Sequence, residues 1–370
     1  MKRILHMTPP EIKNGVYRYI FNHMPCINQE DYQFCFLTKN AEELLDSPEH
    51  ERFNFPVYKL NSVQRNGREA FIKEIKGILS EGFDVVHLHS SAWRGFLIEE
   101  VAMEMGIGKV IVHSHSTGID FESQEERDTI RREHEYYKKR FTMEYATDLC
   151  ACSELAADWL FSEAIPRDCI KILPNAIDAR KFAFNREIRD RLRKKLGIQY
   201  KTVFGHIGRY SYTKNQIFLV DAFFEACKTN RNLYLIMIGQ GENINRVKRH
   251  VQSLGMESCV KCFSWTDNVV EYMQAIDVFC LPSRFEGFPI SVVEAQAAGL
   301  RCLVSDKVTN EVNLTGDVTF LPLIMEEWRD SFLHMESNYE RRENIGILEN
   351  AGFTIESSSK KLCALYDGLL

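Results

Sequence analysis

Two glutamates, Glu286 and Glu294, stand eight positions apart at the start of a segment that predicts a helix, residues 289–298. An apolar run ending at Ser283 predicts a strand before them, and Gly-Phe-Pro marks the turn between strand and helix. The N–H groups of a first helical turn bind anions, and Glu294 would lie about 7–8 Å further along the helix. An anion bound there would have a carboxylate on either side. A nucleotide diphosphate sugar has that form, with ribose hydroxyls to donate to Glu294 and sugar hydroxyls to donate to Glu286.

A second loop could supply positive charge to the same ligand. Residues 205–215 follow another apolar run and contain Gly208, Arg209 and Lys214. Glycine lets the backbone approach a ligand closely, and the two cations suit a diphosphate. A dinucleotide site of the GxGxxG type is not expected, because Gly239 and Gly241 lack the third glycine.

The composition sets the class of protein that carries these loops. A chain of 370 residues with 45% hydrophobic and 26% charged residues fits about two globular domains. The net charge of −6 argues against a nucleic-acid-binding protein. No apolar run reaches the roughly 18 residues of a membrane span, and Pro9 comes too early for a signal peptide, so we expect a cytoplasmic protein. The eleven cysteines are an odd number, typical of reduced thiols, and the single CxxC at Cys259 and Cys262 does not predict a zinc site.

Short apolar runs alternate with amphipathic segments along the whole chain. Each run is too short for a helix and not strictly alternating, as in parallel strands buried on both faces. The expected strands are residues 4–7, 33–37, 84–89, 109–113, 148–153 and 170–173, then 202–208, 233–239, 260–265, 278–283, 301–305 and 318–321. This pattern predicts an α/β protein with two doubly wound parallel sheets, separated by a charged helix within residues 178–200. We expect domains at residues 1–180 and 181–350, then a C-terminal helix, 351–370, that caps the second domain or returns to the first.

These motifs resemble glycosyltransferase family 4, the retaining transferases of GT-B fold. Glu286 and Glu294 match the family's E-x7-E signature, and Gly208, Arg209, Lys214 and Asn215 match its G-R-x4-K-N motif. Residues 174–178 and 151–154 match further family motifs, and residues 112–116 resemble the first-domain histidine loop of its capsule and exopolysaccharide branch. The chain departs from the pattern in two places. The usual Gly-Gly of the first loop is reduced to Gly15, and Ala176 replaces a glycine.

The resemblance implies a donor site on the second of two Rossmann-like domains that face across a cleft, with the acceptor on the first domain. Arg209 and Lys214 would neutralise the leaving diphosphate, helped by backbone N–H groups of Gly287, Phe288 and Ile290; Pro289 has none. Gly15 would bring an N–H to a phosphate from the first domain. The resemblance then requires no metal and no cofactor.

Histidines and one tryptophan complete the implied site. His115 is the best match to the histidine that faces the donor sugar, with His113 as the alternative. His87 and His89 would line the acceptor cleft or belong to the core. Trp265 would stack on the base or simply pack.

The activity implied is transfer of a hexose or N-acetylhexosamine from a nucleotide diphosphate sugar, with UDP the expected nucleotide. The acceptor would be a saccharide, or a saccharide linked to a polyprenyl diphosphate, in surface polysaccharide assembly. A basic, aromatic segment from Arg127 to Phe141 could hold the enzyme peripherally on anionic lipid, or be a solvated helix. Two alternatives remain open at this point: a UDP-sugar 2-epimerase of the same fold, and a non-catalytic nucleotide-sugar-binding protein.

Overall fold

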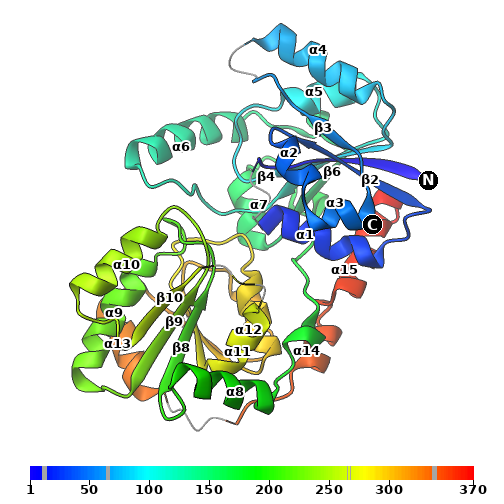
Figure 1. Cartoon of the computed structure of the whole chain (residues 1–370). Helices are drawn as coiled ribbons and strands as arrows, with labels where there is room; N and C mark the ends of the chain where they lie inside the picture. The colour runs from blue at the N-terminus through cyan, green and yellow to red at the C-terminus, as the bar shows by residue number, and fades with distance from the viewer. Residues whose placement is uncertain (11–14, 64–66, 265, 267, 336–339) are drawn as a thin grey trace. The chain divides into compact units, whose positions relative to one another are not determined.

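A computed structural model describes residues 1–10, 15–63, 67–264, 266, 268–335 and 340–370 of the chain (Figure 1). The chain forms two compact units. The first comprises residues 1–119, 128–176 and 355–370, and the second comprises residues 120–127 and 177–354. Trp265 lies outside the described residues.

The first unit is built on a parallel sheet of seven strands in the order β3-β2-β1-β4-β5-β6-β7. Its strands are β1 (Lys2–Met7), β2 (Tyr32–Thr38), β3 (Val57–Lys59), β4 (Val85–Ser90), β5 (Lys109–Ser114), β6 (Asp148–Ala151) and β7 (Ile170–Ile172). Its helices are α1 (Gly15–His23), α2 (Ala41–Leu45), α3 (Pro48–Phe53), α4 (Arg68–Leu79), α5 (Leu97–Glu104), α7 (Glu154–Leu160) and α15 (Ile355–Asp367), with all but the first turn of α6 (Gln124–Lys138).

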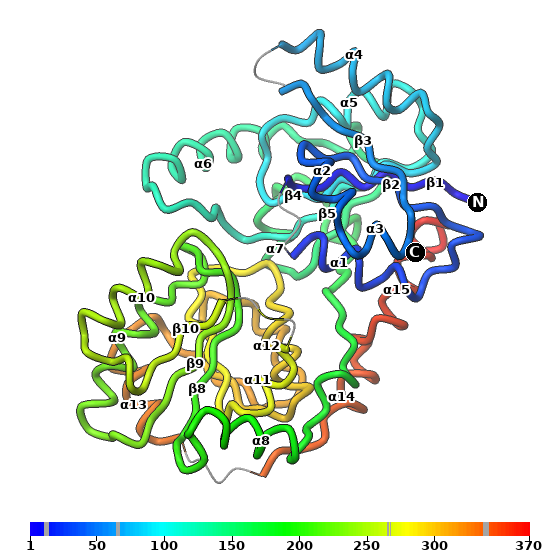
Figure 2. The backbone as a smooth tube through the Cα atoms, in the orientation of Figure 1, coloured from blue at the N-terminus to red at the C-terminus, as the bar shows by residue number. Residues whose placement is uncertain are grey.

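The second unit repeats this architecture with six described strands in the order β10-β9-β8-β11-β12-β13 (Figure 2). Its strands are β8 (Thr202–Ile207), β9 (Leu233–Ile238), β10 (Val260–Phe263), β11 (Val278–Leu281), β12 (Arg301–Ser305) and β13 (Val318–Leu321). Its helices are α8 (Arg186–Leu196), α9 (Gln216–Thr229), α10 (Ile244–Ser253), α11 (Val269–Ala275), α12 (Ile290–Ala297), α13 (Met325–His334) and α14 (Ile345–Asn350). Every residue of β8, β9 and β11 is buried, as expected of strands covered by helices on both faces.

Each sheet reverses its strand order beside its first strand. In the first unit β1 lies between β2 and β4, and in the second unit β8 lies between β9 and β11. In open parallel sheets the loops that leave such a switch point diverge and open a crevice at the carboxyl ends of the strands. The switch points therefore determine where ligands bind in each unit.

The predicted α/β class and the two doubly wound sheets are confirmed. Strand β3 was not predicted, because its three residues are too few to show a pattern. The C-terminal helix α15 returns to the first unit, where Leu362, Leu365 and Tyr366 pack in the core cluster of the sheet. Among the described residues, no helix has the length and apolarity needed to cross a lipid bilayer.

Candidate active site

The switch point of the second unit brings the two predicted motifs together. The loop after β8 carries Gly208, Arg209 and Lys214, and the loop after the neighbouring strand β11 carries Glu286. Lys214 Nζ donates to Glu286 Oε1 at 2.6 Å, and Ser283 Oγ donates to the same oxygen at 2.6 Å. Both members of the ion pair are largely buried, with 17% and 12% of their side chains exposed. The pairing joins residues 72 positions apart and fixes a cation beside a carboxylate.

Asn215 links the loop after β8 to the loop after β11 by hydrogen bonds. It has a positive φ of 57°, which Asn tolerates better than most residues, and it directly precedes helix α9. Its Nδ2 donates to Pro282 O at 3.2 Å, and its Oδ1 accepts from Arg284 at 2.7 Å. The backbone N–H of Arg284 donates to Thr213 O at 2.8 Å. The asparagine of the motif is therefore a structural residue that aligns Lys214 with Glu286.

Arg209 has a partner that the sequence analysis did not identify. Its guanidinium forms an ion pair with Asp120, whose other carboxylate oxygen accepts from the N–H of Thr213 at 2.9 Å. Asp120 belongs to the short segment 120–127 that is part of the second unit. Glu122 in the same segment forms an ion pair with Arg246 at 2.9 Å. No local pattern in the sequence marks these pairings.

Helix α12 begins at Ile290, and Pro289 precedes it in an extended conformation. Phe288 is buried and stacks on Phe353, with ring centroids 5.4 Å apart. Glu294 lies in the second turn and is fully buried, so the structure places this carboxylate inside the unit. The backbone from Gly287 to Ile290 leads directly into the helix, and anion binding by this turn stays a prediction.

The glycine pair after β9 packs against the loop that follows β8. A Cβ on Gly239 would lie 1.9 Å from the carbonyl oxygen of Gly208, and one on Gly241 would lie 2.4 Å from that of Tyr210. Glycine is therefore required at both positions by the close approach of two backbones. Their role is to pack against the loop that carries Arg209.

The predicted histidines His87, His89, His113 and His115 gather at the switch point of the first unit, together with His6, which was not predicted. His6 of β1 pairs in register with His87 of β4, and His89 pairs with His113 of β5; His115 follows two residues later. Because side chains alternate along a strand, these five residues lie on one face of the sheet. Gly15, predicted for the same unit, is the first residue of α1; the four residues before it lie outside the described residues.

Hydrogen bonds link the five rings in two series. His6 Nδ1 and His89 Nε2 share one at 3.0 Å, and His89 Nδ1 and His115 Nε2 share one at 2.8 Å. His87 Nε2 and His113 Nδ1 share one at 3.2 Å. Burial lowers the pKa of His115 and of His6 to about 3 and holds those of the other three well below the usual range. The rings are therefore neutral at physiological pH.

The basic segment is only partly available to a ligand. Arg127 is buried, donates to the carbonyl oxygen of Glu122 at 2.7 Å and lies 3.8 Å from the ring centre of Tyr212. It therefore cannot serve as a surface cation, unlike the exposed residues of the rest of the segment. The exposed cations are Arg131, Arg132, Lys139 and Arg140.

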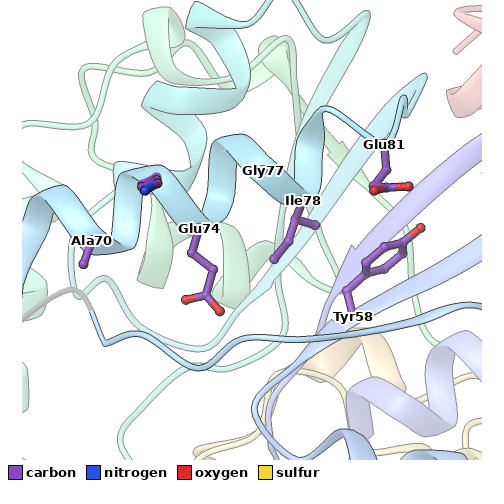
Figure 3. Close-up of a pocket in the computed structure, with 7 residues that line it drawn as sticks. Tyr58, Ala70, Glu74, Gly77, Ile78 and Glu81 are labelled. Atoms are coloured by element: carbon purple, nitrogen blue, oxygen red, sulfur yellow. The ribbon is translucent and has the colours of Figure 1, made fainter.

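The first unit also has an open groove of about 520 Å³ between β3 and α4. Figure 3 shows Glu74 and Ile78 projecting from α4 and Tyr58 coming from β3. None of the predicted site residues lines this groove. The candidate donor site therefore lies in the second unit, at the switch point.

Sequence comparison matches both halves of the chain to glycosyltransferases. Residues 13–181 match the family described as Glycosyltransferase Family 4, and residues 188–321 match Glycosyl transferases group 1. The chain is 28% identical to the glycosyltransferase EpsF of Bacillus subtilis, over 94% of this chain and 96% of that protein. It is 25% identical to an Escherichia coli UDP-Gal:alpha-D-GlcNAc-diphosphoundecaprenol alpha-1,3-galactosyltransferase, over 98% and 96%.

Structure comparison agrees with this result. Anabaena HepE in complex with UDP superposes with a TM-score of 0.76 at 16% identity, over the full length of both chains. The fold is the GT-B fold of two Rossmann-like units. With both family motifs joined at one switch point and both halves of the chain matched, the protein belongs to glycosyltransferase family 4 and is a glycosyltransferase.

Proposed function

We propose that the protein transfers a hexose or N-acetylhexosamine from a UDP-sugar to a saccharide acceptor with retention of anomeric configuration. The observation that carries this proposal is the Lys214–Glu286 pair, which places a cation and an acceptor carboxylate side by side at the switch point. The name of the similar galactosyltransferase specifies a UDP-linked donor, and HepE binds UDP. Both relatives support UDP as the nucleotide.

Donor binding would exchange the partners of the two cations. The diphosphate takes the place of Glu286 on Lys214 and of Asp120 on Arg209, and Glu286 then accepts hydrogen bonds from sugar hydroxyls. As the bond from the anomeric carbon to the diphosphate oxygen breaks, negative charge grows on the leaving group. Cations already in place stabilise that charge without reorganisation.

Retention follows from attack on the face from which the diphosphate leaves. The acceptor oxygen bonds to the anomeric carbon, and its proton passes to the departing phosphate. This route requires no enzyme nucleophile, and it requires neither a metal ion nor a cofactor at the diphosphate.

We propose a lipid-linked acceptor in surface polysaccharide synthesis. The named substrate of the similar Escherichia coli enzyme is a diphosphoundecaprenol-linked sugar, which supports this assignment. The exposed cations Arg131, Arg132, Lys139 and Arg140 of the α6 region would hold the enzyme peripherally on an anionic membrane surface. Each contributes about 1 kcal/mol near such a surface.

A thermal-shift panel with UDP, GDP and ADP tests the donor. A nucleotide at 100 times its dissociation constant adds about 2.7 kcal/mol of stability. We expect UDP to raise the melting temperature and Lys214→Met to abolish the shift. The sugar nucleotides of the stabilising base then identify the sugar, and NMR of the product shows whether the anomeric configuration is kept. Stabilisation by another base, or an inverted product, would refute the corresponding part of the proposal.

Vesicle flotation tests the membrane surface. The variant with Arg131, Arg132, Lys139 and Arg140 all changed to Glu should lose binding to vesicles rich in anionic lipid. Reversing Arg186 and Lys181, which are exposed in the second unit, is the control. Equal binding of the two variants would refute the proposed contact.

A further inference from the structure

The cluster of imidazoles in the first unit has a geometry that transfer does not need. His89, His113 and His115 each offer a ring nitrogen, and the three nitrogens lie within 4.8 Å of one another. His113 is fully buried, whereas His89 and His115 are mostly but not fully buried. Three imidazole nitrogens this close together match the ligand set of a three-histidine metal site.

The hydrogen bonds around these three histidines determine which ring nitrogens remain for a metal ion. His113 Nδ1 is occupied by His87, while its Nε2 is buried and has no hydrogen-bond partner among the described residues. His89 Nε2 is occupied by His6, which leaves His89 Nδ1 directed at His115 Nε2, 2.8 Å away. Two of the three rings, those of His89 and His113, are thus oriented by a second imidazole.

We propose that His89, His113 and His115 form a three-histidine binding site for a divalent transition-metal ion of the Zn²⁺ class. The ligating atoms would be His113 Nε2, His89 Nδ1 and His115 Nε2. His6 and His87 are positioning residues, because each holds the outer nitrogen of a ligand. Tyr366 extends this support, since its hydroxyl hydrogen-bonds to His87 Nδ1 at 3.0 Å.

The chemistry of the triad selects the class of ion. Neutral imidazoles suit Zn²⁺, Cu²⁺ and Ni²⁺, whereas Mg²⁺ and Ca²⁺ prefer oxygen ligands. Zn²⁺ is commonly bound by three histidines with a fourth position open to water or substrate. His89 and His115 are the two partly exposed members of the triad, so an ion would enter from their side.

The inner group of His6, His87 and His89 also has nitrogens within 4.8 Å of one another. It is the weaker candidate, because His6 and His87 are fully buried. In addition, His6 Nδ1 already bonds to His89 and His87 Nε2 already bonds to His113. We therefore assign the metal to the outer triad and the supporting role to the inner residues.

Titration with Co²⁺ tests the site on the full chain, prepared without a histidine tag and dialysed against chelator. Tetrahedral nitrogen coordination gives Co²⁺ visible ligand-field absorption. We expect this signal to saturate at one equivalent and to disappear when Zn²⁺ is added. A sulfur-to-Co²⁺ charge-transfer band would instead place the ion on cysteines and overturn the proposal.

Variants identify the ligands. His113→Gln and His115→Ala should each weaken Co²⁺ binding at least 100-fold, and His87→Phe should weaken it about 10- to 100-fold. His334→Ala removes an exposed histidine of the second unit and is the matched control. Absence of a one-equivalent signal, or an unchanged signal in His115→Ala, would overturn the proposal. The UDP thermal shift is read separately, so failure of the metal site and failure of the donor site are distinguishable.

Discussion

The two switch points occupy the same place in their sheets but carry opposite chemistry. In the second unit, the loops after β8 and β11 hold Arg209, Lys214 and Glu286 as charged partners. In the first unit, β1, β4 and β5 hold imidazoles that burial keeps neutral. The fold thus provides a crevice at each switch point, and the side chains around it decide which ligand it suits. Charged side chains suit an anionic ligand, whereas neutral imidazoles suit a metal ion.

The largest effect on activity should come from removing a cation of the charged switch point. We expect Lys214→Met to lower kcat/KM by about 10²–10³-fold, because one donor to a developing negative charge contributes about 3–4 kcal/mol. Steady-state kinetics measures this, with the sugar nucleotide that the thermal-shift panel identifies as donor. Lys307→Met, an exposed lysine of the same unit, is the control. A rise in KM with unchanged kcat would instead assign Lys214 to ground-state binding.

The next effect concerns a buried carboxyl group of the first unit that is uncharged near neutral pH. Burial raises the pKa of Glu99 in α5 to about 8, from 4.5. The folded state therefore binds more protons than the unfolded state between pH 4.5 and 8, so this group's contribution makes the protein less stable as pH rises through that window. Glu99→Gln should stabilise the protein at pH 8.5 by up to about 5 kcal/mol, since one pKa unit is about 1.4 kcal/mol and burial raises this pKa from 4.5 to about 8.

Denaturant unfolding at pH 5 and pH 8.5 measures this difference. Glu104→Gln, on the exposed face of the same helix, should leave the pH dependence nearly unchanged. A Glu99→Gln variant with the parent's pH profile would show that Glu99 ionises normally.

A smaller effect concerns the support of the imidazole cluster. Tyr366→Phe removes the hydroxyl at 3.0 Å from His87 Nδ1 and leaves that buried nitrogen unpaired. We expect a loss of about 1–2 kcal/mol in the free energy of unfolding. Thermal unfolding measures it, with Tyr200→Phe as the control because Tyr200 is 91% exposed. An unchanged melting temperature would show that water replaces the hydroxyl.

The smallest effect sharpens the description of the charged switch point. Asp120→Asn keeps an oxygen for the N–H of Thr213 but removes the charge that neutralises Arg209. UDP should then bind about two- to five-fold more tightly, because a half-exposed ion pair is worth at most about 1 kcal/mol. Calorimetry measures this, with Asp306→Asn as the control. Weaker binding would show that Asp120 positions Arg209 rather than competing with the diphosphate.

Much of this arrangement could be predicted from the sequence. Parallel strands end at one edge of a sheet, so the approach of Lys214 to Glu286 followed from their places after two strands. The pairing of Arg209 with Asp120 did not follow, because 89 residues separate them and no periodic pattern marks Asp120. The burial of Glu294 depends on which face of α12 packs inward, and that helix has small or apolar residues on all sides.

The same limit applies to α15. Its apolar spacing predicts a helix with one buried face, but spacing does not say which sheet covers that face. The structure shows that His23 Nε2 and Ser358 Oγ share a hydrogen bond at 2.8 Å and that Lys2 pairs with Asp367 at 2.6 Å. These contacts join the first and last segments of the described chain.

The return of α15 has a consequence for the order in which the chain folds during synthesis. Residues 355–370 complete the core of the first unit, yet they leave the ribosome after the whole second unit. The first unit therefore cannot complete its core until the second unit has been synthesised, and the surface that α15 covers stays exposed until then. A chain shortened by residues 355–370 should keep a foldable second unit and lose the stable fold of the first unit.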